Sequence, residues 1–142
     1  MDLLLILRDA IASSLAGGLL VALEARKAGS EVGVLFTQEA LAALARGSFE
    51  WPRELSGQEM RLTLADRAAA VGAASTGRGE GRQLDVRALI PRAREAGVLL
   101  YACPIWSSLL NLEGALPDGL QALEAAELAS LIRDARRVVG SL

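Results

Sequence analysis

The sequence predicts an α/β fold, a single domain built on an open parallel sheet of about five strands with helices on both faces. Two apolar runs, Leu3–Leu7 and Val32–Phe36, are unbroken, whereas a strand with one face in water alternates apolar and polar residues. Such runs fit strands that are covered on both sides. Segments with helical spacing separate the runs, and this alternation is typical of a parallel sheet. The 142 residues suffice for one domain with its own core.

The first part of the chain supplies two strands, two helices and an insertion. After the strand at 3–7, we expect a helix capped by Ser13 or Ser14 that ends at Gly29. After the strand at 32–36, Thr37 stands at the N-cap position of a second helix. Residues 47–82 are predicted to be a variable helical and loop insertion. In it, a capping box at 56–59 opens a helix over about 57–71, and the Gly-rich segment 75–82 forms a mobile loop.

The rest of the chain continues the alternation of helix and strand. In order, we expect a helix over 85–96 interrupted by Pro91, a buried strand over 98–102, a helix over 105–112, a short strand over 119–123, a helix over 124–135 and a strand over 137–142. The inner stripe of the helix over 124–135 is predicted to be Ala125, Leu128, Ile132 and Ala135.

The composition excludes several classes of catalytic site. The chain has no His and one Cys, so it lacks Ser-His-Asp and Cys-His arrangements, His-ligated zinc, an intramolecular disulfide and CxxC redox chemistry. The formal net charge of −2 does not supply the basic surface that nucleic-acid binding needs. We therefore expect no metal, no cofactor and no nucleic-acid partner.

The apolar segments are too short to act as a signal peptide or a membrane span. The run at 3–7 follows Asp2 and meets Arg8 at once, and the segment 15–23 is about half the roughly 20 residues that a span requires. We expect a cytoplasmic protein with no membrane span. The mean hydropathy of +0.34 is high, which indicates a doubly covered sheet or a buried interface in a homo-oligomer.

The polar residues that follow the strands predict where a site would lie. Ligands and reactive groups gather outside the carboxyl ends of parallel strands. That edge would hold Arg8 and Asp9 after the first strand, Thr37 and Gln38 after the second, and Cys103 after the third. Arg8 and Asp9 form either a solvated ion pair or the polar wall of a thiol pocket. Thr37 is most simply a helix cap.

Cys103 is the only strong nucleophile at this edge. Pro104 suits the first turn of a helix, so free backbone N–H groups and the positive end of the helix dipole would favour a thiolate at Cys103. Trp106, three residues later, would shield the thiol from water. The alternative is that Cys103 is a small buried hydrophobic residue, because free Cys is among the most buried residue types. Its position in the sequence leaves both readings open.

The other conspicuous residues have simpler explanations. The arginines at 78, 82, 87, 92 and 94 could meet an acidic partner, but the acidic residues between them favour a solvated face. Trp51 and Trp106 fit core or interface anchors better than ligand platforms. The Gly-rich segment 75–82 lacks the Gly-Lys-Ser/Thr of a phosphate loop.

The strand ends resemble those of the DsrE/DsrF-like family of sulfur carriers. The resemblance rests on Val34-Leu35-Phe36-Thr37, on Val98-Leu99-Leu100-Tyr101-Ala102-Cys103 leading into an apolar helix, and on a tail of Gly, strand, Glu, helix and strand. It covers most of the chain except about 47–82. It implies a parallel α/β domain, often in homo- or hetero-oligomers, that carries sulfane sulfur as a persulfide on the Cys matching Cys103.

These observations lead to one expectation and two alternatives. We expect a sulfurtransferase or sulfur carrier in which Cys103 takes sulfur from a donor persulfide and passes it to an acceptor thiol. Its partners would be sulfur donor and acceptor proteins or small thiols. The alternatives are a non-enzymatic ligand-binding or oligomeric subunit with an inert Cys, and a thiol peroxidase. The residues expected around the thiol are Asp9, Ser13, Thr37, Gln38, Pro104 and Trp106.

Overall fold

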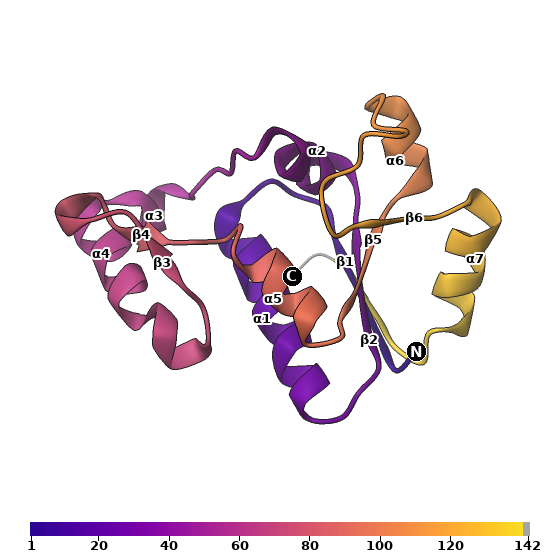
Figure 1. The fold of residues 1–142 in the computed structure, drawn as a ribbon, viewed down its shortest axis with the longest axis horizontal. Helices are drawn as coiled ribbons and strands as arrows, with labels where there is room; N and C mark the ends of the chain where they lie inside the picture. Colours follow the sequence, from indigo (N-terminus) through magenta and orange to yellow (C-terminus); the bar gives the residue numbers. More distant parts are fainter. Residues whose placement is uncertain (141–142) are drawn as a thin grey trace.

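A parallel sheet forms the centre of the computed structural model, which describes residues 1–140 (Figure 1). All its strands are parallel and lie in the order β6-β5-β2-β1-β7. Their bounds are Leu3–Leu7 for β1, Val32–Phe36 for β2, Leu99–Ala102 for β5, Gln121–Ala122 for β6 and Val138–Gly140 for β7. The predicted open parallel sheet of five strands is therefore confirmed.

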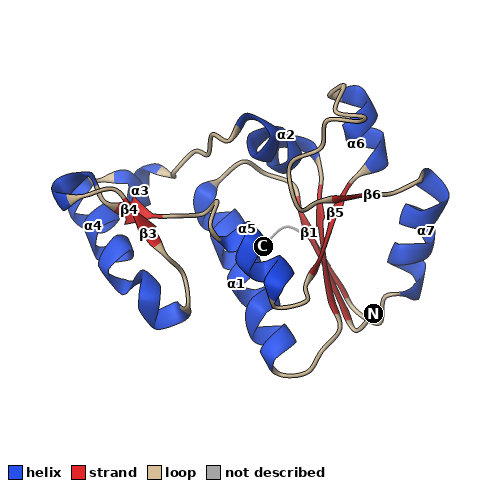
Figure 2. Ribbon diagram, viewed as in Figure 1, coloured by secondary structure: helices blue, strands red, loops and turns tan. Residues whose placement is uncertain are grey.

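Helices cover both faces of the sheet, as expected (Figure 2). On one face lie α1 (Ala12–Lys27) and α5 (Leu89–Glu95), and on the other lies α7 (Ala125–Asp134). At the carboxyl end of the strands lie α2 (Gln38–Arg46) and α6 (Pro104–Leu109). No helix among residues 1–140 combines the length and the apolar character that crossing a membrane requires.

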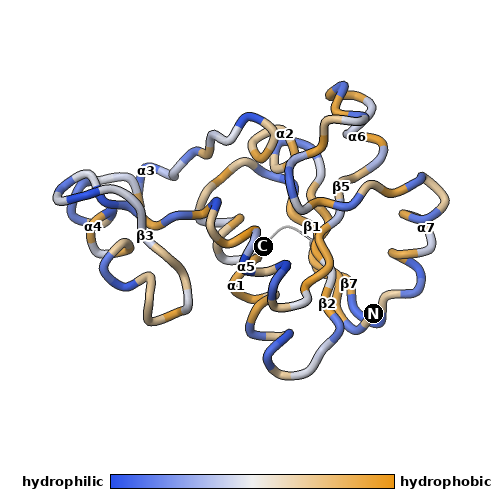
Figure 3. The backbone as a smooth tube through the Cα atoms, viewed as in Figure 1, coloured by the Kyte–Doolittle hydropathy of each residue, from blue (hydrophilic) through white to orange (hydrophobic). Residues whose placement is uncertain are grey.

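The core consists of two unequal clusters, one on each face of the sheet. Alternate strand residues such as Leu5, Val34 and Leu100 pack against α1 and α5 and are almost completely buried. The strand residues between them, such as Leu35 and Tyr101, point to the opposite face and pack near α7. Figure 3 shows the most hydrophobic segments gathered in the central strands. The unbroken apolar runs of the sequence thus correspond to strands buried on both sides.

The direction of the chain across the sheet reverses at β6. From β1 the chain moves through β2 and β5 to β6, and the connection from β5 to β6 packs Leu110, Leu112 and Leu116 on the α1 side. From β6 the chain crosses the opposite face through α7 and joins the far edge as β7. In open α/β sheets a crevice forms where successive connections leave in opposite directions, here outside the ends of β5 and β6.

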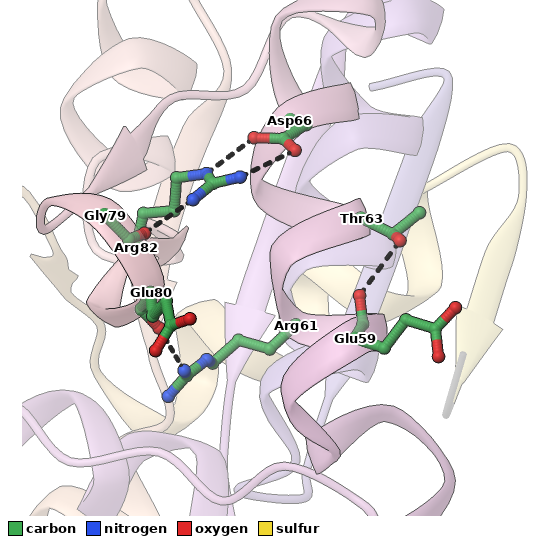
Figure 4. Close-up of polar contacts among 7 residues, drawn as sticks. All are labelled: Glu59, Arg61, Thr63, Asp66, Gly79, Glu80 and Arg82. Atoms are coloured by element: carbon green, nitrogen blue, oxygen red, sulfur yellow. Dashed lines mark hydrogen bonds and ion pairs between the residues drawn. The ribbon is translucent and has the colours of Figure 1, made fainter.

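The insertion forms a lobe beyond α1 and α5 (Figure 1). Its elements are α3 (Arg53–Ser56), α4 (Gln58–Arg67), the 3-10 helices η1 (Ala68–Val71) and η2 (Gly79–Gly81), and the strands β3 (Ser75–Thr76) and β4 (Gln83–Leu84). Residues 75–82, expected to be a loop, contain regular structure, because β3 pairs with β4 as an antiparallel hairpin and η2 lies between them. Arg82 holds this hairpin to α4 by donating to both carboxylate oxygens of Asp66 at 2.7 and 3.0 Å (Figure 4). Arg61 donates to the Glu80 carbonyl.

Two of the predicted helix caps are replaced by other contacts. Ile11 is the N-cap of α1, and the Ala12 amide donates to the Glu50 carbonyl at 2.6 Å, so no serine cap is needed. Gly57 is the N-cap of α4. The Ser56 hydroxyl donates instead to the Arg53 carbonyl at 3.2 Å, which removes the expected capping box.

Two helices differ in detail from the predicted pattern. Because α5 begins at Leu89, Pro91 lies in the first turn, where a missing N–H costs little, and the helix is not interrupted. Ile132 of α7 is 41% exposed, while Leu128, Leu131 and Ala135 face the sheet. The contact stripe therefore runs through Leu131 in place of Ile132. The last predicted strand is described as far as Gly140, and residues 141–142 lie outside the described part.

Two adjacent glycines of α1 provide a matched pair of stability variants. A Cβ at Gly18 would lie 2.6 Å from Cδ2 of Leu7, whereas a Cβ at Gly17 would have nothing within 4 Å. Gly17→Ala should raise the free energy of unfolding by about 0.5–1 kcal/mol through helix propensity. In Gly18→Ala the new methyl group crowds Leu7, and overpacking of this kind typically lowers the free energy of unfolding by roughly 1–3 kcal/mol, which offsets the gain in helix propensity. Urea denaturation measures the difference, and equal stabilities would show that Leu7 moves without cost.

Protonation of Asp66 should release the hairpin from α4. Hydrogen bonds from Arg82 lower the pKa of Asp66, so the pairing contributes stability above the unfolded pKa of about 3.9 and loses it as the pH falls through the folded value. Asp66→Asn removes the charge at neutral pH and should speed amide hydrogen exchange at 75–84 but not in α1. Glu59→Gln on the same helix is the control. Unchanged exchange in Asp66→Asn would contradict this role of the pair.

Candidate functional site

The ends of four neighbouring strands lie in register at the carboxyl edge. Leu7 pairs with Phe36, Phe36 with Ala102, and Ala102 with Ala122. The ladder continues for one further hydrogen bond on two strands: the Thr37 amide donates to the Leu7 carbonyl and the Cys103 amide to the Phe36 carbonyl, both at 3.0 Å. The residues that follow these ends, Arg8, Thr37, Cys103 and Leu123, therefore form one row across the edge.

Cys103 joins β5 to α6. It is the N-cap of α6, with extended backbone angles, and Pro104 occupies the first turn as the sequence predicts. The Cys103 carbonyl accepts a hydrogen bond from the Ser107 amide at 2.8 Å. The placement of the thiol at a strand end and a helix start is thus present in the structure.

The thiol of Cys103 is nearly enclosed by apolar side chains. Cys103 is 5% exposed and belongs to the cluster on the α7 side of the sheet, together with the buried Leu35 and Tyr101. Trp106 and Leu123 pack against the same cluster and are themselves only partly buried. Trp106 thus lies against the cluster that contains Cys103, and it also packs against the cluster on the α1 side.

Tyr101 does not supply a base for the thiol. Burial raises the pKa of its phenol, and the Glu31 carboxylate raises it further. Tyr101 therefore remains protonated and neutral near pH 7. The chain also has no His, so neither a phenolate nor an imidazole is available to accept the thiol proton of Cys103.

The junction of β2 and α2 next to Cys103 carries backbone strain. Thr37 is the N-cap of α2 and 8% exposed, but its side chain forms no capping hydrogen bond, so the predicted cap is present only as backbone. Gln38 has a φ of 51°, in the left-handed region that disfavours residues with a Cβ. Strained residues of this kind occur often at functional sites, which draws attention to this edge.

Asp9 and Ser13 do not join the thiol in one pocket. The Asp9 carboxylate accepts a hydrogen bond from the Ile11 amide at 3.2 Å, which closes a local turn before α1. Ser13 lies within the first turn of α1 and is partly buried. Neither residue lines the pocket beside α6 described next. The residues that the structure gathers at this edge are therefore Cys103, Pro104 and Trp106, with Thr37 and Gln38 on the neighbouring strand.

A pocket of about 290 Å³ lies between α6 and the start of α7. We call it the α6–α7 pocket. It occupies the crevice expected where the chain reverses at β6. Its lining includes Pro104, Ser107, Glu113, Leu116, Leu123 and Glu124. Pro104 and Leu123 connect it to the surroundings of Cys103, since Pro104 follows Cys103 directly and Leu123 packs on the thiol's cluster.

Ser107 is the most unusual residue of this pocket. It is 6% exposed, and its hydroxyl has no hydrogen-bond partner among residues 1–140. A buried polar group without a partner typically costs about 1–3 kcal/mol, so such groups call for an explanation. Ser107, Glu113 and Glu124 are not among the site residues expected from the sequence. Their signal was available, because Ser107 lies one helical turn after Cys103 and Glu124 directly follows the predicted strand at 119–123.

The pocket carries negative charge. No Lys or Arg of residues 1–140 lines it, whereas Glu113 and Glu124 do. The Glu124 side chain accepts from the N3 amide of α7, and the Glu124 amide donates to Glu127 at 2.7 Å, a reciprocal capping box. The positive end of α7 is therefore already balanced by carboxylates. Residues 1–140 contain no cluster of three or more Cys, Asp or Glu side chains suited to a metal ion.

Replacing Gln38 by Gly should relieve the strain beside the site. Gly adopts a φ of 51° without a steric penalty, so Gln38→Gly should raise the free energy of unfolding by about 1 kcal/mol. Gln58→Gly, at the first position of α4, is the matched control and should destabilise. Urea denaturation compares the two variants. A loss of stability in Gln38→Gly as large as in the control would argue against strain at this position.

Comparison with known proteins assigns no family to the chain. No family model matches the sequence, and no curated protein is similar enough to match it. The resemblance to the DsrE/DsrF-like family therefore stays an expectation from the strand ends.

Proposed function

We propose that the protein is a sulfur carrier that holds sulfane sulfur as a persulfide on Cys103. The observation that carries the proposal is the position of the only Cys of the chain, at the carboxyl end of β5, beside a pocket at the point where the sheet connections reverse. This is where open α/β sheets place ligands and reactive groups. The resemblance of the strand ends to DsrE/DsrF-like sulfur carriers supports the same reaction.

The proposed chemistry is a thiol exchange that needs no cofactor. The Cys103 thiolate attacks the terminal sulfur of a donor persulfide, so a bond forms between Sγ and this sulfur. The S–S bond of the donor breaks, and the donor leaves as a thiolate with the electron pair. An acceptor thiolate then attacks the outer sulfur of the Cys103 persulfide and releases Cys103 as a thiolate. No net oxidation occurs, because one S–S bond replaces another in each step.

The burial of Cys103 supports a second candidate function. A thiol that is 5% exposed in an apolar cluster also fits a structural residue in a ligand-binding or oligomeric subunit. Sulfur transfer requires that a thiol only 5% exposed become accessible to the donor, and two side chains that pack against its cluster, Trp106 and Leu123, are only partly buried. The two functions therefore differ in whether the native thiol can be reached from solution.

The proposed setting is the cytoplasm, with donor and acceptor proteins or small thiols as partners and with a homo-oligomer as the assembly. Exposed apolar side chains support the assembly: Val21 is 47% exposed and Val71 is 54% exposed, and both line one groove between α1 and η1. Such side chains are common where copies of a chain meet.

Incubation with a sulfane-sulfur donor should add one sulfur atom to Cys103. Intact mass spectrometry should show this increase in the wild type, its loss after reduction, and its absence in Cys103→Ser and in Cys103→Ala, which places no hydroxyl in the apolar cluster. Circular dichroism checks that both variants are folded. Sulfur retained by Cys103→Ser would contradict the proposal.

Two further treatments separate the alternatives. A native protein that takes up no sulfur and resists alkylation until it unfolds would establish Cys103 as a structural residue and favour the binding subunit. Rapid oxidation by peroxide without any sulfur uptake would favour a thiol peroxidase, in which Cys103 forms a sulfenic acid.

A further inference from the structure

The α6–α7 pocket offers binding groups at a defined spacing from Cys103. Ser107 lies four residues after Cys103, the N-cap of α6, and its amide donates to the Cys103 carbonyl at 2.8 Å, so the two residues adjoin across the first turn of the helix. The Ser107 hydroxyl is buried and has no partner among residues 1–140. A ligand atom able to hydrogen bond with it would remove the cost of leaving it unpaired.

The charge of the pocket selects the kind of ligand atom. Glu113 is exposed and forms no hydrogen bond or ion pair with its side chain among residues 1–140, and Glu124 adds a second carboxylate. An anionic group would be repelled, whereas an ammonium group can donate to the hydroxyl and to a carboxylate at once. The basic residue of the same row is Arg8, at the end of β1. Because β1 lies two strands from β5, the backbone of Arg8 is about 10 Å from that of Cys103.

We propose that the α6–α7 pocket binds the ammonium group of a small aminothiol, or of its persulfide, while the sulfur of this ligand faces Cys103. The inference rests on the proposed sulfur chemistry of Cys103 and names the class of donor or acceptor. A volume of about 290 Å³ suits a small molecule better than a folded partner. Cys103 does not line the pocket, but Pro104, the next residue, and Leu123, which packs on the same cluster as Cys103, do. In an aminothiol only two carbons separate nitrogen from sulfur, so an ammonium group bound in the pocket keeps the sulfur of the ligand near this side of it.

Matched thiol reagents of opposite charge test this preference directly. Aminoethyl methanethiosulfonate is cationic, and sulfonatoethyl methanethiosulfonate is an anion of similar size. In both reactions the Cys103 thiolate attacks the sulfenyl sulfur, a disulfide forms, and methanesulfinate leaves with the electron pair. After each rate constant is divided by that for a free small thiol, the cationic reagent should react with the native protein faster by about tenfold.

Two variants connect the preference to the pocket. Glu113→Gln should bring the ratio of rate constants toward one, and Ser107→Ala should slow the cationic reagent more than the anionic one. Glu95→Gln, an exposed glutamate on α5 outside the pocket, is the matched control and should leave the ratio unchanged. Equal rates with the two reagents, no reaction with either in the native state, or a ratio unaffected by Glu113→Gln would each overturn the inference.

The reagents also separate this inference from the proposed function. A tenfold cationic preference without any persulfide formation would support the pocket and refute the sulfur carrier. Persulfide formation at equal rates from cysteamine persulfide and 3-mercaptopropionate persulfide would support the carrier and refute the cationic pocket.

Discussion

The register of the parallel ladder is the constraint on which the candidate site depends. Because Leu7, Phe36 and Ala102 are hydrogen-bonded partners, the residues after them must emerge together at one edge. A shift of one residue in β5 would exchange its two faces and move Cys103 from the α7 side to the α1 side. The buried side chains on both faces prevent such a shift, because alternate residues of each strand belong to two different hydrophobic clusters, one on each face of the sheet. Packing in the middle of the sheet therefore fixes the position of the thiol.

The two faces of the sheet differ in how firmly they are covered, and Cys103 lies on the weaker one. On the first face, α1 buries Leu15 and Leu19, and α5 buries Leu89. On the other face, α7 contributes no fully buried residue, although Leu128 and Leu131 contact the sheet. Elements with few buried apolar contacts open at lower free energy than the core. A thiol that is 5% exposed can thus be enclosed at rest and still lie under the less firmly packed of the two helical layers.

The sequence predicts the centre of the sheet well, because β1, β2 and β5 are short apolar runs that are separated by segments with helical spacing. For the same reason it places Cys103 at the end of a strand. It fails where contacts between distant residues replace local signals. The first amides of α1 find the Glu50 carbonyl and not Ser13, and Arg82 orders a Gly-rich segment by reaching Asp66. Neither partner can be chosen from spacing alone. The α6–α7 pocket was missed for a related reason, since it exists only because β6 returns beside β5 and brings Glu124 close to Ser107.

The chemistry available to this edge follows from what surrounds the thiol. Acid–base catalysis needs a group that exchanges a proton near neutral pH, but the chain has no His, and burial keeps the Tyr101 phenol protonated. Thiol exchange needs only a thiolate, a leaving thiolate and alignment of the sulfurs. In the proposed sulfur exchange, discrimination between thiols therefore comes from binding. Two carboxylates and an unpaired hydroxyl one helical turn from the thiol are the groups that can supply it, so charge at the pocket rather than proton transfer should decide which thiols react.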